Sequence, residues 1–108
     1  MKKTIETIAN SDLVVFFSKT DCKYCDMLER DLRAMDVPYK KVMLNETDLR
    51  DDLIESTGVK TVPQLFIAGK FIGGYSEFTK LCTTSPVFSN FAFYKLMSSH
   101  GIVPSDDF

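Results

Sequence analysis

The stretch LVVFFSKTDCKYC, residues 13–25, decides the fold of this chain. Its first five residues are a continuous run of β-forming apolar residues, as expected for a strand that is buried on both faces. Cys22 and Cys25 follow, three residues apart, where a helical pattern begins. The apolar stripe of this predicted helix is Met27, Leu28, Leu32 and Met35. The stretch therefore predicts a buried strand that leads into a helix with two cysteines in its first turn.

Length and composition predict a single globular domain over residues 1–108. A chain of 108 residues can form one core but not two ordinary domains. It is 44% hydrophobic and 26% charged, which argues against disorder, and its net charge of −2 predicts neither a nucleic-acid partner nor a membrane surface. No apolar run is long enough for a signal peptide or a membrane span. We therefore expect a reducing compartment, the cytoplasm, where a C-x-x-C motif is catalytic or metal-binding rather than a permanent crosslink.

The rest of the chain alternates between helical and strand patterns. In chain order the patterns predict a helix ending near Asn10, a strand over 39–44, a helix from about 47 to Gly58, a hairpin of strands 64–68 and 71–72 with its turn at Gly69-Lys70, a helix with Ser76 as its N-cap, and a last helix from Pro86 to Gly101. This order predicts an α/β fold: a central four-stranded mixed sheet with helices on both faces.

Cys22 and Cys25 are the candidate redox residues. At this spacing two cysteines share one face of a helix and lie close enough to form and break a disulfide. The free N–H groups of the helix end and the basic neighbours Lys19 and Lys23 lower the pKa of a thiol there, whereas Asp21 opposes them. We expect Cys22, nearer the exposed helix end, to be the nucleophile, and Cys25 to be the resolving thiol that displaces the product as a new disulfide.

Two further motifs are expected beside the cysteines. Thr61-Val62-Pro63 precedes the third strand, and an X–Pro bond is the only one that adopts the cis form at appreciable frequency. A cis bond would turn the backbone groups of Val62 toward the cysteines, where they can pair with an extended, peptide-like substrate. The run of residues 73–77, Gly-Gly-Tyr-Ser-Glu, allows close backbone approach, and the helix end after it can hold a carboxylate.

Together, K-x-x-C-x-x-C at 19–25, T-V-P at 61–63 and G-G-Y-S-E at 73–77 resemble the glutaredoxin family, over roughly residues 12–82. The resemblance implies a thioredoxin-like fold, a cis Pro63, and glutathione as the partner, bound to Cys22 as a mixed disulfide. It also implies that residues 83–108 are a divergent C-terminal helix and tail.

The resemblance also implies which residues hold glutathione. Its glycine carboxylate would meet cations, its cysteinyl backbone would pair with Val62, and its γ-glutamyl end would lie at the start of the helix after the two glycines. The two carboxylates and one ammonium of glutathione suit two cations, a helix N-terminus and one acid. The expected glutathione-binding residues are Lys19, Tyr24, Arg50, Thr61, Val62, Pro63, Tyr75, Ser76 and Glu77.

The implied activity is that of a glutathione-dependent thiol–disulfide oxidoreductase, a monomer that reduces protein disulfides and protein–glutathione mixed disulfides without a metal. Lys23 keeps an alternative open, because glutaredoxins without proline at this position include carriers of a glutathione-ligated [2Fe–2S] cluster. Thioredoxin itself normally has tryptophan-glycine-proline in the motif, and this chain has no tryptophan. A zinc site would need two more ligands, and only Cys82 and His100 remain. We expect Cys82 to be a small apolar residue rather than a third catalytic thiol.

Overall fold

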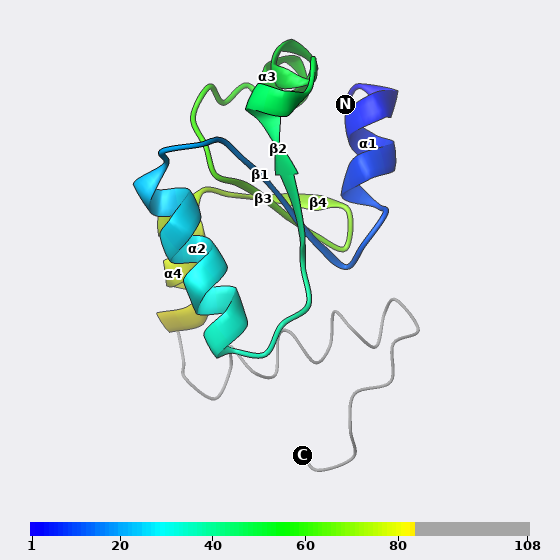
Figure 1. The fold of residues 1–108 in the computed structure, drawn as a ribbon. Helices are drawn as coiled ribbons and strands as arrows, with labels where there is room; N and C mark the ends of the chain where they lie inside the picture. The colour runs from blue at the N-terminus through cyan, green and yellow to red at the C-terminus, as the bar shows by residue number, and fades with distance from the viewer. Residues whose placement is uncertain (84–108) are drawn as a thin grey trace.

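The computed structural model describes residues 1–83, so the predicted last helix and the tail after it lie outside the described residues. Figure 1 shows the elements, which are α1 (Lys3–Ala9), β1 (Val14–Ser18), α2 (Lys23–Ala34), β2 (Lys40–Met43), the 3-10 helix η1 (Leu44–Glu46), α3 (Arg50–Thr57), β3 (Gln64–Ile67), β4 (Lys70–Gly73) and α4 (Tyr75–Thr83). Within the described part of the chain, none of the helices has the length and apolar character needed to cross a bilayer.

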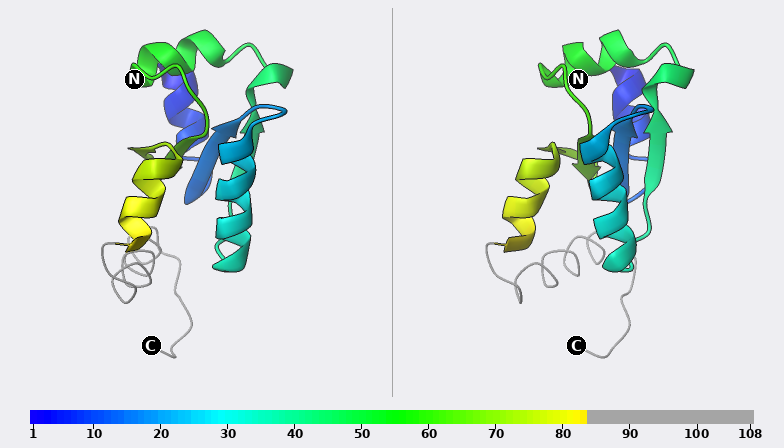
Figure 2. Two further views of the ribbon diagram at one scale, coloured as in Figure 1. Left: turned by 90° about the vertical axis from the view of Figure 1, so that its left-hand side faces the viewer. Right: turned by 60° about the vertical axis from the view of Figure 1, so that its left-hand side comes forward.

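The sheet has four strands in the order β2-β1-β3-β4. β1 pairs with β2 in parallel and with β3 antiparallel, and β3 and β4 form an antiparallel hairpin. Helices α2 and α4 pack on one face and α1 and α3 on the other, as the two views in Figure 2 show. The predicted α/β architecture, a mixed four-stranded sheet with helices on both faces, is confirmed.

The core is divided into two clusters by the sheet, and β1 contributes to both. Val14 and Phe16 lie in the cluster under α2 and α4, whereas Val15 and Phe17 lie in the cluster under α1 and α3. All four side chains are fully buried, as the continuous apolar run predicted. Each contributes roughly 1.5–3 kcal/mol by leaving water. A strand anchored on both faces holds its own end rigidly, and that end leads to the two cysteines.

Several predicted boundaries are wrong by one to three residues, and three of them have a clear local reason. The hairpin turn is Ala68-Gly69, both with positive φ (55° and 76°), so Lys70 belongs to β4, where it pairs with Ile67. Helix α4 begins at Tyr75, which places Ser76 inside the first turn instead of at the N-cap. Helix α3 begins at Arg50 rather than near 47, because residues 44–46 form the separate 3-10 turn η1.

Candidate active site

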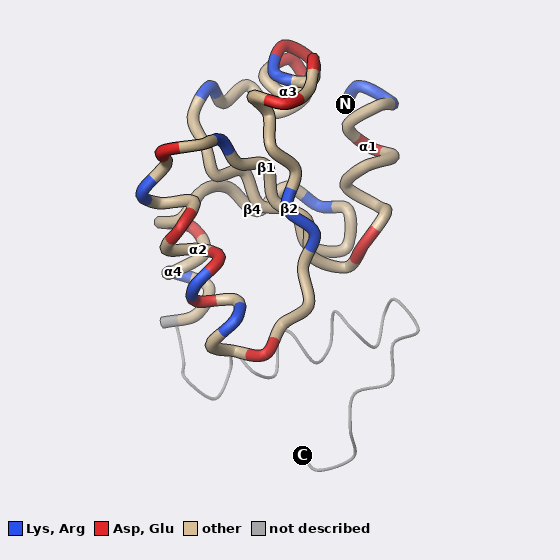
Figure 3. The backbone as a smooth tube through the Cα atoms, in the orientation of Figure 1, with Lys and Arg blue, Asp and Glu red and all other residues tan. Residues whose placement is uncertain are grey.

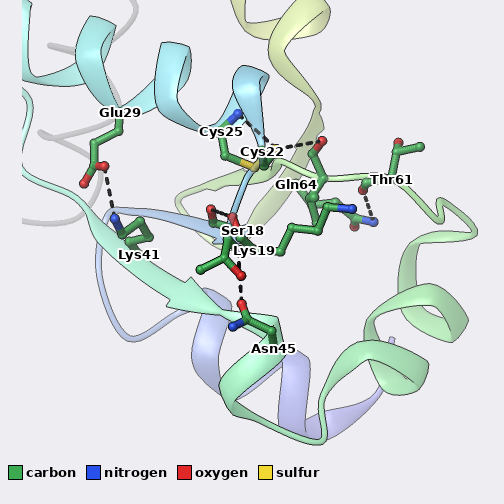
Figure 4. Close-up of a disulfide and its surroundings, with 11 residues drawn as sticks. Ser18, Lys19, Cys22, Cys25, Glu29, Lys41, Asn45, Thr61 and Gln64 are labelled. Carbon is green, nitrogen blue, oxygen red and sulfur yellow. Dashed lines mark hydrogen bonds and ion pairs between the residues drawn. A yellow bond between two sulfur atoms is a disulfide. The ribbon is translucent and has the colours of Figure 1, made fainter.

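The two cysteines lie at the junction between the end of β1 and the start of α2, as predicted. Cys22 is the N-cap of α2, with extended backbone (φ −112°, ψ 106°), and Cys25 lies in the first turn. The two form a disulfide with their Cα atoms 5.2 Å apart, and the N–H of Cys25 donates to Cys22 Sγ at 3.2 Å (Figure 4). Cys22 is 7% exposed and Cys25 is 2% exposed. The outer sulfur is therefore the one that a substrate reaches first.

The loop before β3 faces this dithiol through its backbone. The Val62–Pro63 peptide bond is cis, as the resemblance implied, and the carbonyl oxygen of Val62 lies 3.7 Å from Cys22 Sγ. Gln64, which is buried, fixes the loop from inside: its Nε2 donates to the carbonyl oxygens of Val59 (2.8 Å) and Thr61 (3.1 Å). Sequence reasoning missed Gln64, although a glutamine at the start of a buried strand signals such a role, because a buried amide needs partners.

The turn between β4 and α4 is built around one carboxylate. Glu77 reaches back over the first turn of α4 and accepts hydrogen bonds from the N–H of Gly74 (2.6 Å) and the hydroxyl of Ser76 (2.9 Å). These bonds, that from Gly74 first, lower the pKa of the Glu77 carboxyl. Gly73, at φ +130°, lies so close that a Cβ on it would come within 2.6 Å of Glu77 Cγ. Gly73 thus makes room for an acid that caps the helix in place of a Ser76 side chain.

Two cavities open on either side of residues 61–62. The first, of about 640 Å³, lies between that loop, β4 and the start of α4. We call it the α4-side cavity. Its lining is mainly apolar, with a carboxylate and a hydroxyl at one end, and comprises Tyr24, Val59, Thr61, Val62, Pro63, Phe71, Ile72, Gly73, Gly74, Tyr75, Ser76 and Glu77.

The second cavity, of about 450 Å³, lies between the same loop, the end of β1 and α3, and we call it the α3-side cavity. Three cations line it, and in Figure 4 the side chain of Lys19 extends from the end of β1 toward the segment with Thr61 and Gln64. Arg50 is the only basic residue of α3, at its first position, on a helix whose other charges are acidic (Figure 3). The lining comprises Lys19, Cys22, Leu44, Asn45, Arg50, Leu53, Ile54, Lys60, Thr61, Val62 and Gln64.

The structure brings every predicted site residue to this region. Seven of the predicted residues line the α4-side cavity, and Lys19, Arg50 and Cys22 line the α3-side cavity, with Thr61 and Val62 common to both. Besides Gln64, sequence reasoning missed two further polar residues of the α3-side cavity, Asn45 and Lys60. Lys60 directly precedes the T-V-P motif, so its position in the chain was a usable signal. Asn45 had none, because it comes from η1, which no pattern predicted.

Cys82 lies apart from the two cavities. It is half-buried on α4, and burial first, with a smaller contribution from the charge of Asp31, raises the pKa of its thiol. A thiol of raised pKa is a poor nucleophile at neutral pH, which agrees with the prediction of a non-catalytic residue. Among the described residues, no group of three or more His, Cys, Asp or Glu side chains is placed to hold a metal ion.

Three features define a dithiol protein of the thioredoxin fold. A disulfide lies at the N-terminus of the helix after the first buried strand, a cis-proline loop faces it, and both lie on a mixed four-stranded sheet. Comparison with known proteins narrows the class. The sequence profile of the glutaredoxin family matches residues 14–72, and the chain belongs to that family.

Individual relatives support membership of the glutaredoxin family. The chain is 42% identical over 80 residues to "Glutaredoxin-2, mitochondrial" of Mus musculus, a match that covers 70% of this chain and 51% of that protein. It is 38% identical over 78 residues to the glutaredoxin of Vernicia fordii, covering 68% and 75%. The chain spans about half the length of the mammalian relatives it matches.

Solved structures with the same fold include glutaredoxins from plants. The holo form of glutaredoxin C1 from Populus tremula x tremuloides has a TM-score of 0.73 and 36% identity, covering 79% of this chain and 88% of that one. A buckwheat glutaredoxin–glutathione complex has a TM-score of 0.75 and 26% identity, covering 94% and 91%.

Proposed function

We propose that this protein is a glutathione-dependent thiol–disulfide oxidoreductase that reduces protein–glutathione mixed disulfides and protein disulfides. One observation carries the proposal: Cys22 Sγ lies 3.7 Å from the Val62 carbonyl oxygen, where a cationic cavity and an apolar cavity with an acid meet. A tripeptide disulfide-bonded to Cys22 would have its peptide groups beside the Val62 backbone and one end in each cavity. The related buckwheat protein is titled a complex with glutathione, which supports this choice of ligand.

Each end of glutathione finds complementary groups. The glycine carboxylate suits the α3-side cavity, because Lys19, Arg50 and Lys60 line it. The γ-glutamyl end carries an ammonium and a carboxylate, which suit the Glu77 carboxylate and the N-terminus of α4. The exposed Tyr24 and the half-buried Tyr75 add an apolar wall to this end of the site.

The chemistry follows from the order of the two sulfurs. With the dithiol reduced, the Cys22 thiolate is stabilised by the N–H of Cys25 and by the N-terminus of α2. It attacks the glutathionyl sulfur of a mixed disulfide, and the protein thiolate leaves. A second glutathione thiolate then attacks the glutathionyl sulfur on Cys22, so that glutathione disulfide forms and Cys22 is regenerated.

A protein disulfide takes the second route. Cys22 attacks one sulfur of the substrate, Cys25 then attacks Cys22 Sγ, and the substrate leaves as a dithiol while the Cys22–Cys25 disulfide forms. The disulfide of the structure is the product of this step. Two glutathione molecules restore the dithiol and leave as glutathione disulfide.

Substitution of each cysteine tests the proposal. Cys22→Ser removes the attacking sulfur from both routes, and we expect less than about 1% of wild-type activity in a coupled assay with a glutathionylated peptide. Cys25→Ser removes only the resolving sulfur, so removal of glutathione from the peptide persists while reduction of a protein disulfide is lost. Retention of activity in Cys22→Ser, or reduction by thioredoxin reductase in place of glutathione, would contradict the assignment.

Family membership favours this activity over the thioredoxin-like reductase. The pairing of Cys22 with Cys25 favours it over the cluster carrier, which belongs to the same family but uses Cys22 as a cluster ligand. The proposal includes a monomer in a reducing compartment, the cytoplasm, because the dithiol must be re-reduced by glutathione in each cycle. Gel filtration of the purified protein, and fractionation of the cells that make it, test these two points.

A further inference from the structure

A stack of three aromatic rings runs from the core to the surface beside the dithiol. Phe78 is 1% exposed and belongs to the core, Tyr75 lies above it with ring centroids 6.2 Å apart, and Tyr24 lies above Tyr75 at 6.0 Å. Tyr24, at 55% exposure, forms the outer end. Tyr24 and Tyr75 both line the α4-side cavity, so the middle ring determines the position of that wall.

The middle ring is tied to the opposite helix. The Tyr75 hydroxyl donates to Asp31 Oδ2 at 2.7 Å, a contact between the start of α4 and the third turn of α2. Asp31 Oδ1 accepts from the guanidinium of Arg30 at 3.2 Å, which holds the carboxylate in turn. The hydrogen bond from Tyr75 to Asp31, first among several causes, raises the pKa of the Tyr75 phenol. A hydrogen bond to a carboxylate is among the stronger ones, and it fixes a ring that would otherwise turn about its side-chain bonds.

We propose that Asp31 is a positioning residue for the glutathionyl substrate: it holds Tyr75, and through it Tyr24, as a preformed wall of the α4-side cavity. The inference rests on the proposed function and extends it to a residue that lines neither of the two cavities. Asp31 acts on binding and not on sulfur chemistry, because Cys22 Sγ accepts from the Cys25 N–H and lies beside the Val62 carbonyl, and Asp31 takes part in neither contact. Preorganisation of this kind lowers the ordering cost of binding.

Asp31→Leu and Tyr75→Phe remove the two partners of the bond. We expect the KM for a glutathionylated peptide to rise about fivefold in each variant. This is the cost of immobilising one or two side chains on binding. kcat stays within about twofold of wild type. Asp31→Asn keeps an acceptor of the same shape, and its KM should lie between those of Asp31→Leu and wild type. Because both single variants break the same bond, the double variant should raise KM no further.

The molecule offers a matched control on the same helix. Tyr39 donates to Glu29 Oε2 at 2.6 Å, which is again a tyrosine–carboxylate bond from α2 to another part of the chain, but neither residue lines the two cavities. Tyr39→Phe should leave KM unchanged. An equal rise of KM in Tyr39→Phe and Tyr75→Phe would overturn the proposal, because the effect would then be general loosening of α2.

An optical titration tests the bond without any substrate. The chain has four tyrosines and no tryptophan, so alkaline difference absorbance reports the phenols alone. In Asp31→Leu one tyrosine should ionise at lower pH than in wild type, since the carboxylate that raises its pKa is gone. This shift together with an unchanged KM would overturn the positioning role and leave the proposed function intact. A wild-type protein without glutathione-dependent activity would overturn both, whatever the titration gives.

Discussion

The two cavities beside Cys22 share Thr61 and Val62 but hold their other walls in different ways. On the α3 side, the ammonium groups of Lys19 and Lys60 make no hydrogen bond or ion pair within residues 1–83. Arg50 reaches only Asp51, at 3.6 Å, and both of these side chains are largely exposed. This end presents long, exposed cationic side chains that are held weakly or not at all by bonds within residues 1–83.

The α4 side is the reverse. Glu77 is bound to Gly74 and Ser76, and Tyr75 is bound to Asp31, so acid and ring are in place beforehand. We infer that the α3 side recognises its ligand by exposed charges alone, whereas the α4 side adds a preformed wall to the charge of Glu77. Charge recognition at an exposed site is weakened by salt, whereas a preformed wall is not. Substitutions at the two ends should therefore change KM and its dependence on salt in different ways.

The largest effect is expected from a substitution at Gly73, whose backbone lies against Glu77 on the α4 side. Gly73→Ala places a Cβ at φ +130° and within 2.6 Å of Glu77 Cγ and Oε1, so both the backbone and Glu77 must shift. We expect a loss of about 1–3 kcal/mol in the free energy of unfolding in urea. The KM for a glutathionylated peptide should rise about tenfold or more, because Glu77 no longer faces the substrate.

Gly58→Ala is the matched control for this variant. Gly58 also has positive φ (73°), but no heavy atom lies within 4 Å of the position of its Cβ. Gly58→Ala should lower the free energy of unfolding by about 1–2 kcal/mol, through the left-handed backbone alone, and leave KM unchanged. If KM rises equally in both, the link between Gly73 and Glu77 is wrong.

A smaller effect is expected at the charged end. Lys19→Gln should raise KM about fivefold at low ionic strength, the scale of one exposed charge-assisted contact. The KM of the wild-type protein should rise with added salt, and that of Lys19→Gln should change less. Lys3→Gln, on α1 and away from both cavities, serves as control. An identical salt dependence in wild type and Lys19→Gln would contradict charge recognition.

The fold was predictable from sequence where burial dominates. Residues 13–17 had to be covered on both faces, and the helical stripe after Cys25 had to pack on them, so the order of elements followed. The boundaries depended on local backbone preferences that composition does not reveal. Ala68 adopts positive φ beside Gly69, and Glu77 reaches back to Gly74, which moved the hairpin turn and the start of α4 by one or two residues from their predicted positions.

The candidate site was predictable where it is contiguous in the chain. The dithiol, the T-V-P loop and the G-G-Y-S-E run each carry their own signal, and the fold brings them together. Contacts between distant residues carry none: Tyr75 and Asp31 are 44 residues apart, and nothing about an aspartate on a helix predicts its partner. The preformed character of the α4 side could therefore be recognised only in three dimensions.

The smallest expected effect concerns the acid at the preformed end. Hydrogen bonds from Gly74 and Ser76 hold the pKa of Glu77 below its ordinary 4.5. A lowered carboxyl pKa contributes stability that is complete above the ordinary value and is lost as the pH falls through the folded-state value. The melting temperature of wild type should therefore exceed that of Glu77→Gln at neutral pH, and the difference should shrink as the pH falls below about 4.5.

Ser76→Ala distinguishes the two hydrogen bonds. It removes the weaker cause of the pKa shift and keeps the bond from the Gly74 N–H, so its melting temperature should retain most of the wild-type dependence on pH. Lys19→Gln should show the full wild-type dependence, because the charged end has no part in it. A difference between wild type and Glu77→Gln that stays constant from neutral to acid pH would show that the amide caps α4 as well as the carboxylate does. The α4 side would then owe its preformed shape to the backbone and to Tyr75, and the contrast between the two ends would rest on the tyrosine alone.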